Sequence, residues 1–390
     1  MLDVFGDYSA RDPLTALTRA VRSCPYQEAA ENGGLYALGA HDVRRLLVSR
    51  DVWSERSTDQ RLASMDEEDA ARRRALKRFL AHWPVFSDAA YHDRVRRVTV
   101  RLLRGTVTPE TLSACARWAD RRLAVTDGEP VDWLRDVARP MALEAIVVLV
   151  GREDAARLVR LGEAVMDELA TARIDMARID RALAAVDALR AWLETARAEP
   201  PTPLTAGLSE LWDDPGYGPE SATALLTQIV TGAYDPTTTA LCVAGERVDS
   251  DVLARVPIPS VREEVLRIAT PFRFASRYAR RPVSVGPYRL DEGERINLCL
   301  ATANLDPEQF PEPLRIRDRG NASRNLSFGA GKHYCPGAPL ARAVVEVLLE
   351  SMRKAGVHFR PERVLREPEL PMLRYRELTG RLVPAAWPDR

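Results

Sequence analysis

One cysteine of this chain stands in a sequence setting suited to metal chemistry. Cys335 lies within FGAGKHYCPGAPLAR, residues 328–342, just before a run whose apolar residues recur at helical spacing. A thiol at the start of a helix faces the positive end of the helix dipole and backbone N–H groups without intrahelical partners. Both favour the thiolate, which is the ligand that a haem iron needs for O–O bond cleavage. A lone cysteine at such a place is more commonly an inert core residue, so the surrounding residues must decide.

The residues around Cys335 match a family signature. The segment resembles the haem-binding signature of cytochromes P450, Phe-Gly-x-Gly-x-His-x-Cys-x-Gly followed by Leu-Ala-Arg, and each of these positions matches. The resemblance implies that Cys335 is the proximal ligand to the iron of haem b, that His333 binds a haem propionate and that Phe328 shields the sulfur. Gly337, which has no Cβ, allows the chain to approach a flat macrocycle closely.

Two further segments resemble the same family. Glu264 and Arg267 lie three apart on a predicted helix, so a carboxylate and a guanidinium share one face there. Such pairs are common on protein surfaces, but upstream of the cysteine this one resembles the family's Glu-x-x-Arg. The resemblance implies a structural role, in which the pair holds the chain that precedes the haem loop. The segment ATANLDPEQFPEPLRI, residues 301–316, also resembles the family's Ala-Asn-x-Asp-Pro-x-x-Phe run.

Four polar residues are candidates for binding the haem propionates. Arg277, in TPFRFASRYA, falls where members of the family pair an arginine with a propionate. His92 and Arg96 are four apart on a predicted helix, so both side chains project from one face. In the family context they resemble the His-x-x-x-Arg pair that reaches the propionates. With His333, these residues are expected to converge on one site.

The helix predicted over residues 219–244 departs from the family pattern. GAYDPTTT stands where the family usually reads small-Gly-x-acid-Thr-Thr. With Asp235 at the acidic position, Pro236 replaces the first threonine, whose hydroxyl orders the protons used in dioxygen activation, and Thr237 keeps the second. Proline has no N–H and can kink a helix, so the carbonyl of Gly232 loses its partner and could hold a water beside Asp235.

An alternative register places Thr237 at the key threonine and Pro236 at the acid. It keeps the hydroxyl but loses the carboxylate and the glycine-like site, and the first register is favoured. Asp235, Pro236 and Thr237 are therefore the candidate catalytic residues. The positions expected to line the distal substrate pocket are Gln228, Thr231, Ala233 and Phe274.

The composition sets the broad class of the protein. The chain has 390 residues, of which 46% are hydrophobic, and its 56 basic and 56 acidic residues balance to zero net charge. This balance gives no sign of a nucleic-acid partner. The start of the sequence does not resemble a signal peptide and the longest apolar run is too short to span a bilayer, which predicts a cytoplasmic protein. Five scattered cysteines without a CxxC pair indicate neither a disulfide framework nor a zinc site.

Helical periodicity dominates the chain. Helices are predicted over residues 88–103, 140–150, 153–170, 176–198, 219–244, 261–268 and 340–354, and short strands over 34–37, 274–278, 283–285, 288–290 and 294–298. The Pro- and Gly-rich stretches between them are too short to be linkers. The sequence therefore predicts one domain over residues 1–390, mostly α with small β-sheets, and the resemblance implies the cytochrome P450 fold.

The resemblance implies an enzyme, a haem-thiolate oxidoreductase that activates dioxygen and hydroxylates a small molecule or peptide in bacterial secondary metabolism. Electrons would come from NAD(P)H through a ferredoxin-type donor, steered by basic residues such as Arg96, Arg97, Lys332 and Arg342. Alternatives are oxidative aromatic cross-linking of a short peptide, peroxide-driven chemistry suggested by Pro236, and a non-catalytic P450-like helper. Such helpers lose the cysteine that this chain keeps. A monomer is expected.

Overall fold

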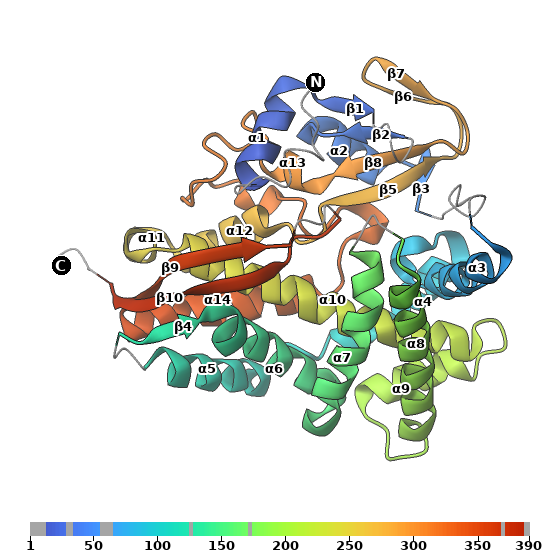
Figure 1. The fold of residues 1–390 in the computed structure, drawn as a ribbon, viewed down its shortest axis with the longest axis horizontal. Coiled ribbons are helices and arrows are strands. Elements are labelled where there is room, and N and C mark those ends of the chain that lie inside the picture. The colour runs from blue at the N-terminus through green and yellow to red at the C-terminus, as the bar shows by residue number, and fades with distance from the viewer. Residues whose placement is uncertain are drawn as a thin grey trace.

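The computed structural model describes residues 13–28, 34–54, 65–124, 128–170, 174–367 and 371–385. Within these ranges helices predominate, and the strands form small sheets (Figure 1). The helices are α1 Pro13–Ser23, α2 Ala40–Leu47, α3 Glu67–Ala81, α4 Ala89–Leu103, α5 Pro109–Leu123, α6 Arg139–Val150, α7 Arg152–Leu169, α8 Met176–Ala196, α9 Pro203–Trp212, α10 Gly218–Arg247, α11 Ser250–Arg255, α12 Ile258–Ala269, α13 Leu300–Asn304 and α14 Ala338–Ala355. The strands are β1 Tyr26–Glu28, β2 Leu35–Ala37, β3 Val52–Trp53, β4 Pro130–Asp132, β5 Phe274–Ala279, β6 Val283–Val285, β7 Tyr288–Leu290, β8 Arg295–Cys299, β9 Val357–Arg366 and β10 Tyr375–Pro384. The predicted class, mostly α with small sheets, is confirmed.

Local sequence signals set several helix ends. The hydroxyl of Thr108 accepts a hydrogen bond from the backbone N–H of Thr111 at the start of α5, where proline occupies the first turn. At the other end of the chain, α14 stops at Gly356, whose φ of 66° is the left-handed conformation that glycine adopts easily. The long helix α10 continues through Pro236 without interruption.

The largest sheet joins segments from distant parts of the sequence. Its strand order is β1-β2-β8-β5-β3, and the central β2 and β8 run parallel, with Leu35 opposite Ile296. The strands at both edges come from the first part of the chain, whereas β5 and β8 lie beyond α12. A second sheet has the order β4-β10-β9, and β6 and β7 form a hairpin. The first sheet lies at one side of the molecule, across from the helices α5 to α9 (Figure 1).

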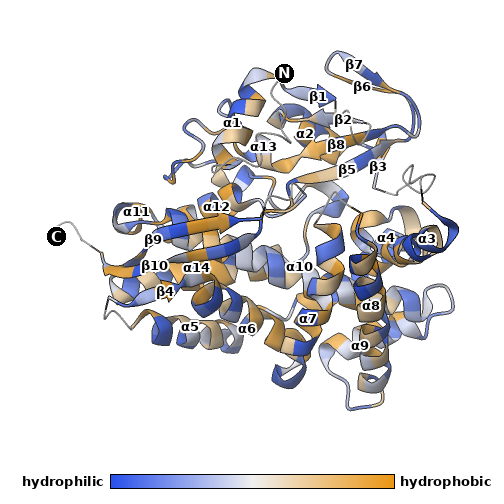
Figure 2. Cartoon of the chain, viewed as in Figure 1, coloured by the Kyte–Doolittle hydropathy of each residue, from blue (hydrophilic) through white to orange (hydrophobic). Residues whose placement is uncertain are grey.

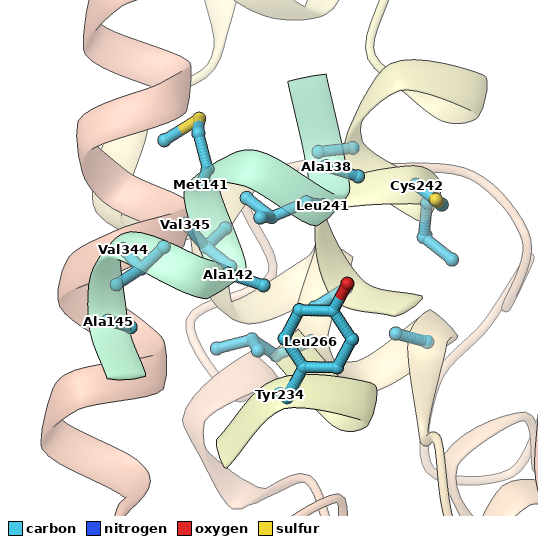
Figure 3. Packing of buried hydrophobic residues seen from close by; sticks show 14 of the residues in the cluster. Ala138, Met141, Ala142, Ala145, Tyr234, Leu241, Cys242, Leu266, Val344 and Val345 are labelled. Atoms are coloured by element: carbon cyan, nitrogen blue, oxygen red, sulfur yellow. The ribbon is translucent and has the colours of Figure 1, made fainter. Parts of the chain in front are cut away.

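The helix α10 runs through the centre of the molecule (Figure 1). It packs against α6, α7, α9, α12 and α14, and Figure 3 shows Leu241 among Met141 and Ala142 of α6 and Val345 of α14. Close packing is enforced at Gly245, because a Cβ there would lie 2.4 Å from the indole ring of Trp133. These contacts hold the middle of α10 in a fixed rotation about its axis.

Hydrophobic residues concentrate on the elements that face the interior (Figure 2). β8, for example, is buried at four of its five positions, whereas α3 begins with a run of charged residues. In the described part of the chain, no helix is both long enough and apolar enough to cross a membrane.

Candidate active site

The loop that carries Cys335 is shaped by glycines and ends at a helix. Gly329 and Gly331 have φ values of 68° and 67°, which side chains with a Cβ adopt only under strain. The backbone N–H of Cys335 donates to the carbonyl of Phe328 at 2.9 Å, which closes the loop. α14 begins three residues later, at Ala338. The sulfur therefore lies at the N-terminal end of a helix, as the sequence predicted.

The electrostatics of the thiol differ from the expectation. Burial raises the pKa of the Cys335 thiol, although the backbone N–H groups of Gly337 and Ala338 and the charges of Arg96 and Arg342 act in the opposite direction. Desolvation of the charged form thus outweighs the helix end. The expected preference for thiolate does not come from the protein alone, and a bound cation would be needed to reverse it.

Two histidines and a carboxylate meet beside this loop. The rings of His92, on α4, and His333, in the loop, have centroids 4.4 Å apart. Nε2 of His333 lies 3.0 Å from the hydroxyl of Ser54 and 3.3 Å from a carboxylate oxygen of Asp88. Asp88 also accepts from the ammonium of Lys332 and from the backbone N–H of Ser54, and hydrogen bonds of this kind hold its pKa below the ordinary value against the effect of burial.

Arg277 completes a cationic cluster at this place. It is 5% exposed, and burial lowers the pKa of its guanidinium to about 10, against the attraction of Asp88. Burial, together with the charge of Arg277, lowers the pKa of His333 to about 4 despite the bond from Asp88. Burial and the charge of Arg96 likewise lower the pKa of His92. The structure thus brings His92, Arg96, Arg277 and His333 together, although they come from three distant stretches of sequence.

This cationic cluster fits an anionic ligand. Among the described residues, Arg277 makes no ion pair, and its guanidinium donates to the carbonyl of Ser276 at 2.9 Å. A buried guanidinium without a counter-ion is costly, and a carboxylate would relieve that cost. Haem carries two carboxylates, its propionates. The basic residues and the neighbouring cysteine loop therefore fit the group that the sequence implies.

One face of α10 is open. Between Ser221 and Gly245, every residue of this helix is buried except Gln228, Gly232, Ala233 and Pro236. These four positions fall on one side of a helix with 3.6 residues per turn. A Cβ added at Gly232 would meet nothing within 4 Å. We call these four residues the accessible face of α10.

The candidate catalytic residues divide between this face and the interior. Pro236 belongs to the accessible face, whereas Thr237 is buried, 5% exposed. The side chain of Asp235 is also buried and points elsewhere, because its carboxylate accepts from Arg374 at 3.1 Å. The register that sets Pro236 in the place of the first threonine stays a prediction.

The residues expected to line the substrate pocket are also divided. Gln228 is on the accessible face, and its side-chain oxygen accepts from the backbone N–H of Val85 at 3.3 Å. Phe274 of β5 is half-buried, with its ring edge-on to that of Tyr36 at 5.9 Å. Thr231 differs from the expectation: it is buried, and its hydroxyl donates to the carbonyl of Thr227 on its own helix.

Glu264 and Arg267 form the centre of a buried network. The guanidinium of Arg267 donates to both oxygens of Glu264, at 2.7 and 3.0 Å, and Arg319 donates to one of them at 2.6 Å. Arg267 also reaches the backbone carbonyls of Asn304 and Pro313, each at 2.7 Å. The pair thereby ties α12 to the chain segment that leads into the cysteine loop.

Three residues of this region were not identified from the sequence. Asp88 precedes a helix, where an aspartate usually acts as a cap, but here its side chain serves Lys332 and His333. Glu163 of α7 and Arg374 before β10 face Asp235, and no local pattern indicates this. Their positions depend on which elements pack against α10.

The fold is that of cytochrome P450 structures, and the cysteine loop lies in a segment that is similar to the cytochrome P450 family. A family model described as cytochrome P450 matches residues 247–355, which include Glu264, Arg267 and Cys335. The crystal structure of CYP108D1 from Novosphingobium aromaticivorans has the same fold, with a TM-score of 0.80 at 20% identity over 97% of this chain and 96% of that one.

Two curated relatives show how far the similarity extends. Mycocyclosin synthase of Mycobacterium tuberculosis is 33% identical over 250 residues, which are 59% of this chain. The match spans 61% of that protein's length. Mycinamicin IV hydroxylase/epoxidase of Micromonospora griseorubida is 28% identical over 310 residues, 74% of this chain and 76% of that protein.

Proposed function

We propose that this protein is a haem-thiolate monooxygenase, one domain over residues 1–390, that oxidises a small molecule or peptide in bacterial secondary metabolism. The observation that carries the proposal is the cationic cluster around the buried Arg277, which adjoins the loop of Cys335. Asp88 supplies one negative charge to this cluster, and the two propionates of a haem would balance the rest. The biosynthetic names of the two curated relatives support the oxidation of a biosynthetic intermediate.

The residues that would hold haem b come from both sides of the site. Cys335 would ligate the iron, with Phe328 and Gly337 beside the sulfur, and the propionates would pair with the basic residues His92, Arg96, Arg277 and His333. When bound, a thiolate-ligated haem iron supplies reductive activation of dioxygen. The polypeptide supplies the remaining functions, which are to bind substrate, to exclude water and to deliver protons.

Proton delivery in this chain cannot use a hydroxyl at residue 236. Pro236 occupies the accessible face of α10, and Thr237 is turned into the interior. Because proline lacks an N–H, the carbonyl of Gly232 is free of its usual helical partner and can accept from a water. We propose that such a water, in exchange with the carboxyl of Asp235 or with a polar group of the substrate, delivers the proton.

A basic groove on α4 suits a redox partner. Its volume is about 510 Å³, and Arg96, Arg97, Arg101 and Arg104 line it together with Asp93 and Val100. Arg101 pairs with Glu210, and the guanidinium groups of Arg96, Arg97 and Arg104 attract an acidic surface and speed up its association at low ionic strength. A ferredoxin-type protein that passes electrons from NAD(P)H has the required charge. We expect the rate of electron transfer to fall as salt is added.

A second candidate function is oxidative cross-linking of a short aromatic peptide. The specific observation in its favour is Pro236, because a reaction that inserts no oxygen can take its protons and hydrogen bonds from the substrate. The two reactions differ in their products. Hydroxylation adds one oxygen atom, whereas coupling removes two hydrogens, so mass spectrometry of the product distinguishes them. Turnover driven by peroxide without a reductase would indicate the peroxide-dependent alternative.

The haem assignment is tested by spectroscopy. The reduced carbon monoxide complex of the wild-type protein should show the absorption band typical of thiolate ligation, and pyridine extraction should give haem b. Cys335→Ala should lose that band or the haem, whereas Cys24→Ala, which removes an exposed thiol, should keep both. An unchanged thiolate band in Cys335→Ala would contradict the proposal.

A further inference from the structure

A second cavity lies against α10, on the side that adjoins the accessible face. Its volume is about 290 Å³, and the α10 residues Asp235, Thr238, Thr239 and Cys242 line it at spacings of three and four. None of them belongs to the accessible face. From α6 and α7 the cavity receives the titratable side chains of Arg139, Glu163 and Asp167. We call it the acidic cavity.

The remaining titratable groups of the acidic cavity belong to α10 and to the chain around β9 and β10. Tyr234 has a hydroxyl whose pKa burial raises to about 12, and burial also raises the pKa of the Cys242 thiol, so both are neutral at physiological pH. Glu367 and Arg374 contribute one charge of each sign, and the hydroxyl of Tyr375 donates to Glu246 at 2.5 Å.

Two oxygen atoms in this cavity have no hydrogen-bonding partner. Oδ2 of Asp235 and the hydroxyl oxygen of Thr238 are both buried, and no group in the described ranges reaches them. The side chain of Asp235 is only 10% exposed. A buried carboxylate oxygen left in this state is costly, so a water or a proton must satisfy it.

The balance of charge favours a proton. The single charge of Arg374 is shared between Asp235 and Asp167, whose carboxylate accepts from it at 2.6 Å, and Arg139 is the other cation that lines the cavity. Glu163 has no such pair in the described ranges; burial, reinforced by the charge of Asp235, raises its pKa. Burial likewise raises the pKa of Asp235, against the attraction of Arg374. Nowhere in the described ranges do three His, Cys, Asp or Glu side chains form a metal-binding group, so no metal site offers itself as the counter-charge.

We propose that Glu163 and Asp235 share one proton across the water of the acidic cavity and that this pair is the proton reservoir of the accessible face of α10. The inference rests on the proposed function and names the route by which protons reach the active site. In the transfer, the carboxyl of Glu163 gives its proton through water to the carboxylate of Asp235 and becomes a carboxylate itself. Asp167 lies four residues further along α7 with a side chain 48% exposed, so it connects Glu163 to solvent for reloading.

In this scheme Glu163 is a positioning residue that acts through Asp235. Asp235 follows Gly232 by three residues on α10, and in this scheme its carboxyl passes the proton to the water at the Gly232 carbonyl. Removal of the Glu163 carboxyl should therefore slow reloading without changing how substrate binds. We expect kcat to fall by about tenfold or more, with KM unchanged; this is less than the roughly hundredfold that a group in direct proton transfer contributes, because Glu163 acts through Asp235.

The test uses the haem-loaded protein and three variants: Glu163→Gln, Glu163→Asp and, as the control, Glu153→Gln, which alters an exposed carboxyl on the same helix. Infrared difference spectroscopy over a pH series should show a protonated carboxyl band near neutral pH in the wild type and in the control. The band should disappear at higher pH and be absent from Glu163→Gln. Glu163→Asp should restore part of the band and part of kcat.

Two results would overturn the inference. One is the absence of a protonated carboxyl band from the wild type near neutral pH; the other is a kcat and pH profile in Glu163→Gln equal to those of the wild type. Either result, obtained on protein with a normal thiolate spectrum, leaves the haem-thiolate assignment standing and rejects only the reservoir. Loss of the thiolate spectrum from the wild type would reject both.

Discussion

Replacement of Glu264 by glutamine should destabilise the protein strongly, because it removes the acid at the centre of a buried network of arginines. The two carboxylate oxygens of Glu264 accept three hydrogen bonds from Arg267 and Arg319, at 2.6 to 3.0 Å. The side chains of Glu264 and Arg267 are completely buried, and that of Arg319 is 4% exposed. Water therefore cannot replace the hydrogen bonds and the negative charge that the carboxylate supplies.

The size of the effect follows from what glutamine leaves behind. The amide has the same shape, but it keeps one accepting oxygen and turns an N–H₂ group toward guanidinium donors. Two buried arginines then lack their counter-ion. Breaking a buried ion pair by removing one partner costs about 3–5 kcal/mol, which is a large share of the roughly 5–15 kcal/mol that stabilises a folded protein.

The assay is urea denaturation followed by circular dichroism, with wild type and variants in the same haem-loaded state because a bound ligand itself stabilises the fold. The control is Asp251→Asn, which removes the acid of an exposed pair with Arg255, 3.7 Å apart and about 70% exposed on both sides. Exposed pairs contribute no more than about 1 kcal/mol. If Glu264→Gln lowers the free energy of unfolding by no more than the control does, the reasoning is wrong.

Three further predictions concern other parts of the molecule. Because the pKa of Glu163 is raised in the folded state, its contribution to stability is present at acid pH and is lost as pH rises through the folded pKa; urea titrations at several pH values should therefore show Glu163→Gln gaining stability over the wild type toward alkaline pH. Gly245→Ala should cost about 1–3 kcal/mol by overpacking against Trp133, whereas Gly105→Ala, with nothing within 4 Å of the new Cβ, should not destabilise. Pro236→Thr restores a hydroxyl to the accessible face of α10 and should change the share of NADPH that ends in product rather than in hydrogen peroxide; an unchanged share would remove Pro236 from the proton route.

Much of the helical framework was predictable from the sequence. Every helix predicted from apolar periodicity is present, with ends displaced by a few residues, and so are the predicted short strands. These elements bury an apolar face, and the spacing of apolar residues along the sequence indicates which face is buried. The Cys335 loop was recognisable for a different reason. Its glycines, histidine and cysteine each meet a requirement of the same short loop, so they stand together in the sequence.

The longest strands were not predicted, because their sequence does not resemble a strand. β9 reads VHFRPERVLR, with a proline in the middle and buried side chains only at Val357 and Phe359. It is extended because β10 supplies its hydrogen bonds, and the two approach so closely that a Cβ at Gly380 would lie 2.1 Å from the carbonyl oxygen of Arg360. Pairing with a distant segment thus overrides local preference.

The direction in which a side chain points from a predicted helix could not be predicted from the sequence either. The sequence places Asp235 on α10, but its carboxylate takes its orientation from Arg374, far along the chain. Likewise, the histidines at 92 and 333 become neighbours only through the packing of α4 against the loop. Chemistry that depends on such encounters is visible only in three dimensions.

The pairing of β2 with β8 has a consequence for synthesis on the ribosome. β2 leaves the ribosome early, but its parallel neighbour is translated only after most of the chain has been made. Until then the nascent chain exposes unpaired strand edges, which are prone to aggregation, and contacts between residues so distant in sequence form slowly. His92 and His333 are also far apart in the sequence, so the haem-binding site is completed only after the cysteine loop has been translated. Haem uptake therefore reports that the segments from α4 to the cysteine loop have come together, and slower synthesis at low temperature should raise the yield of loaded protein.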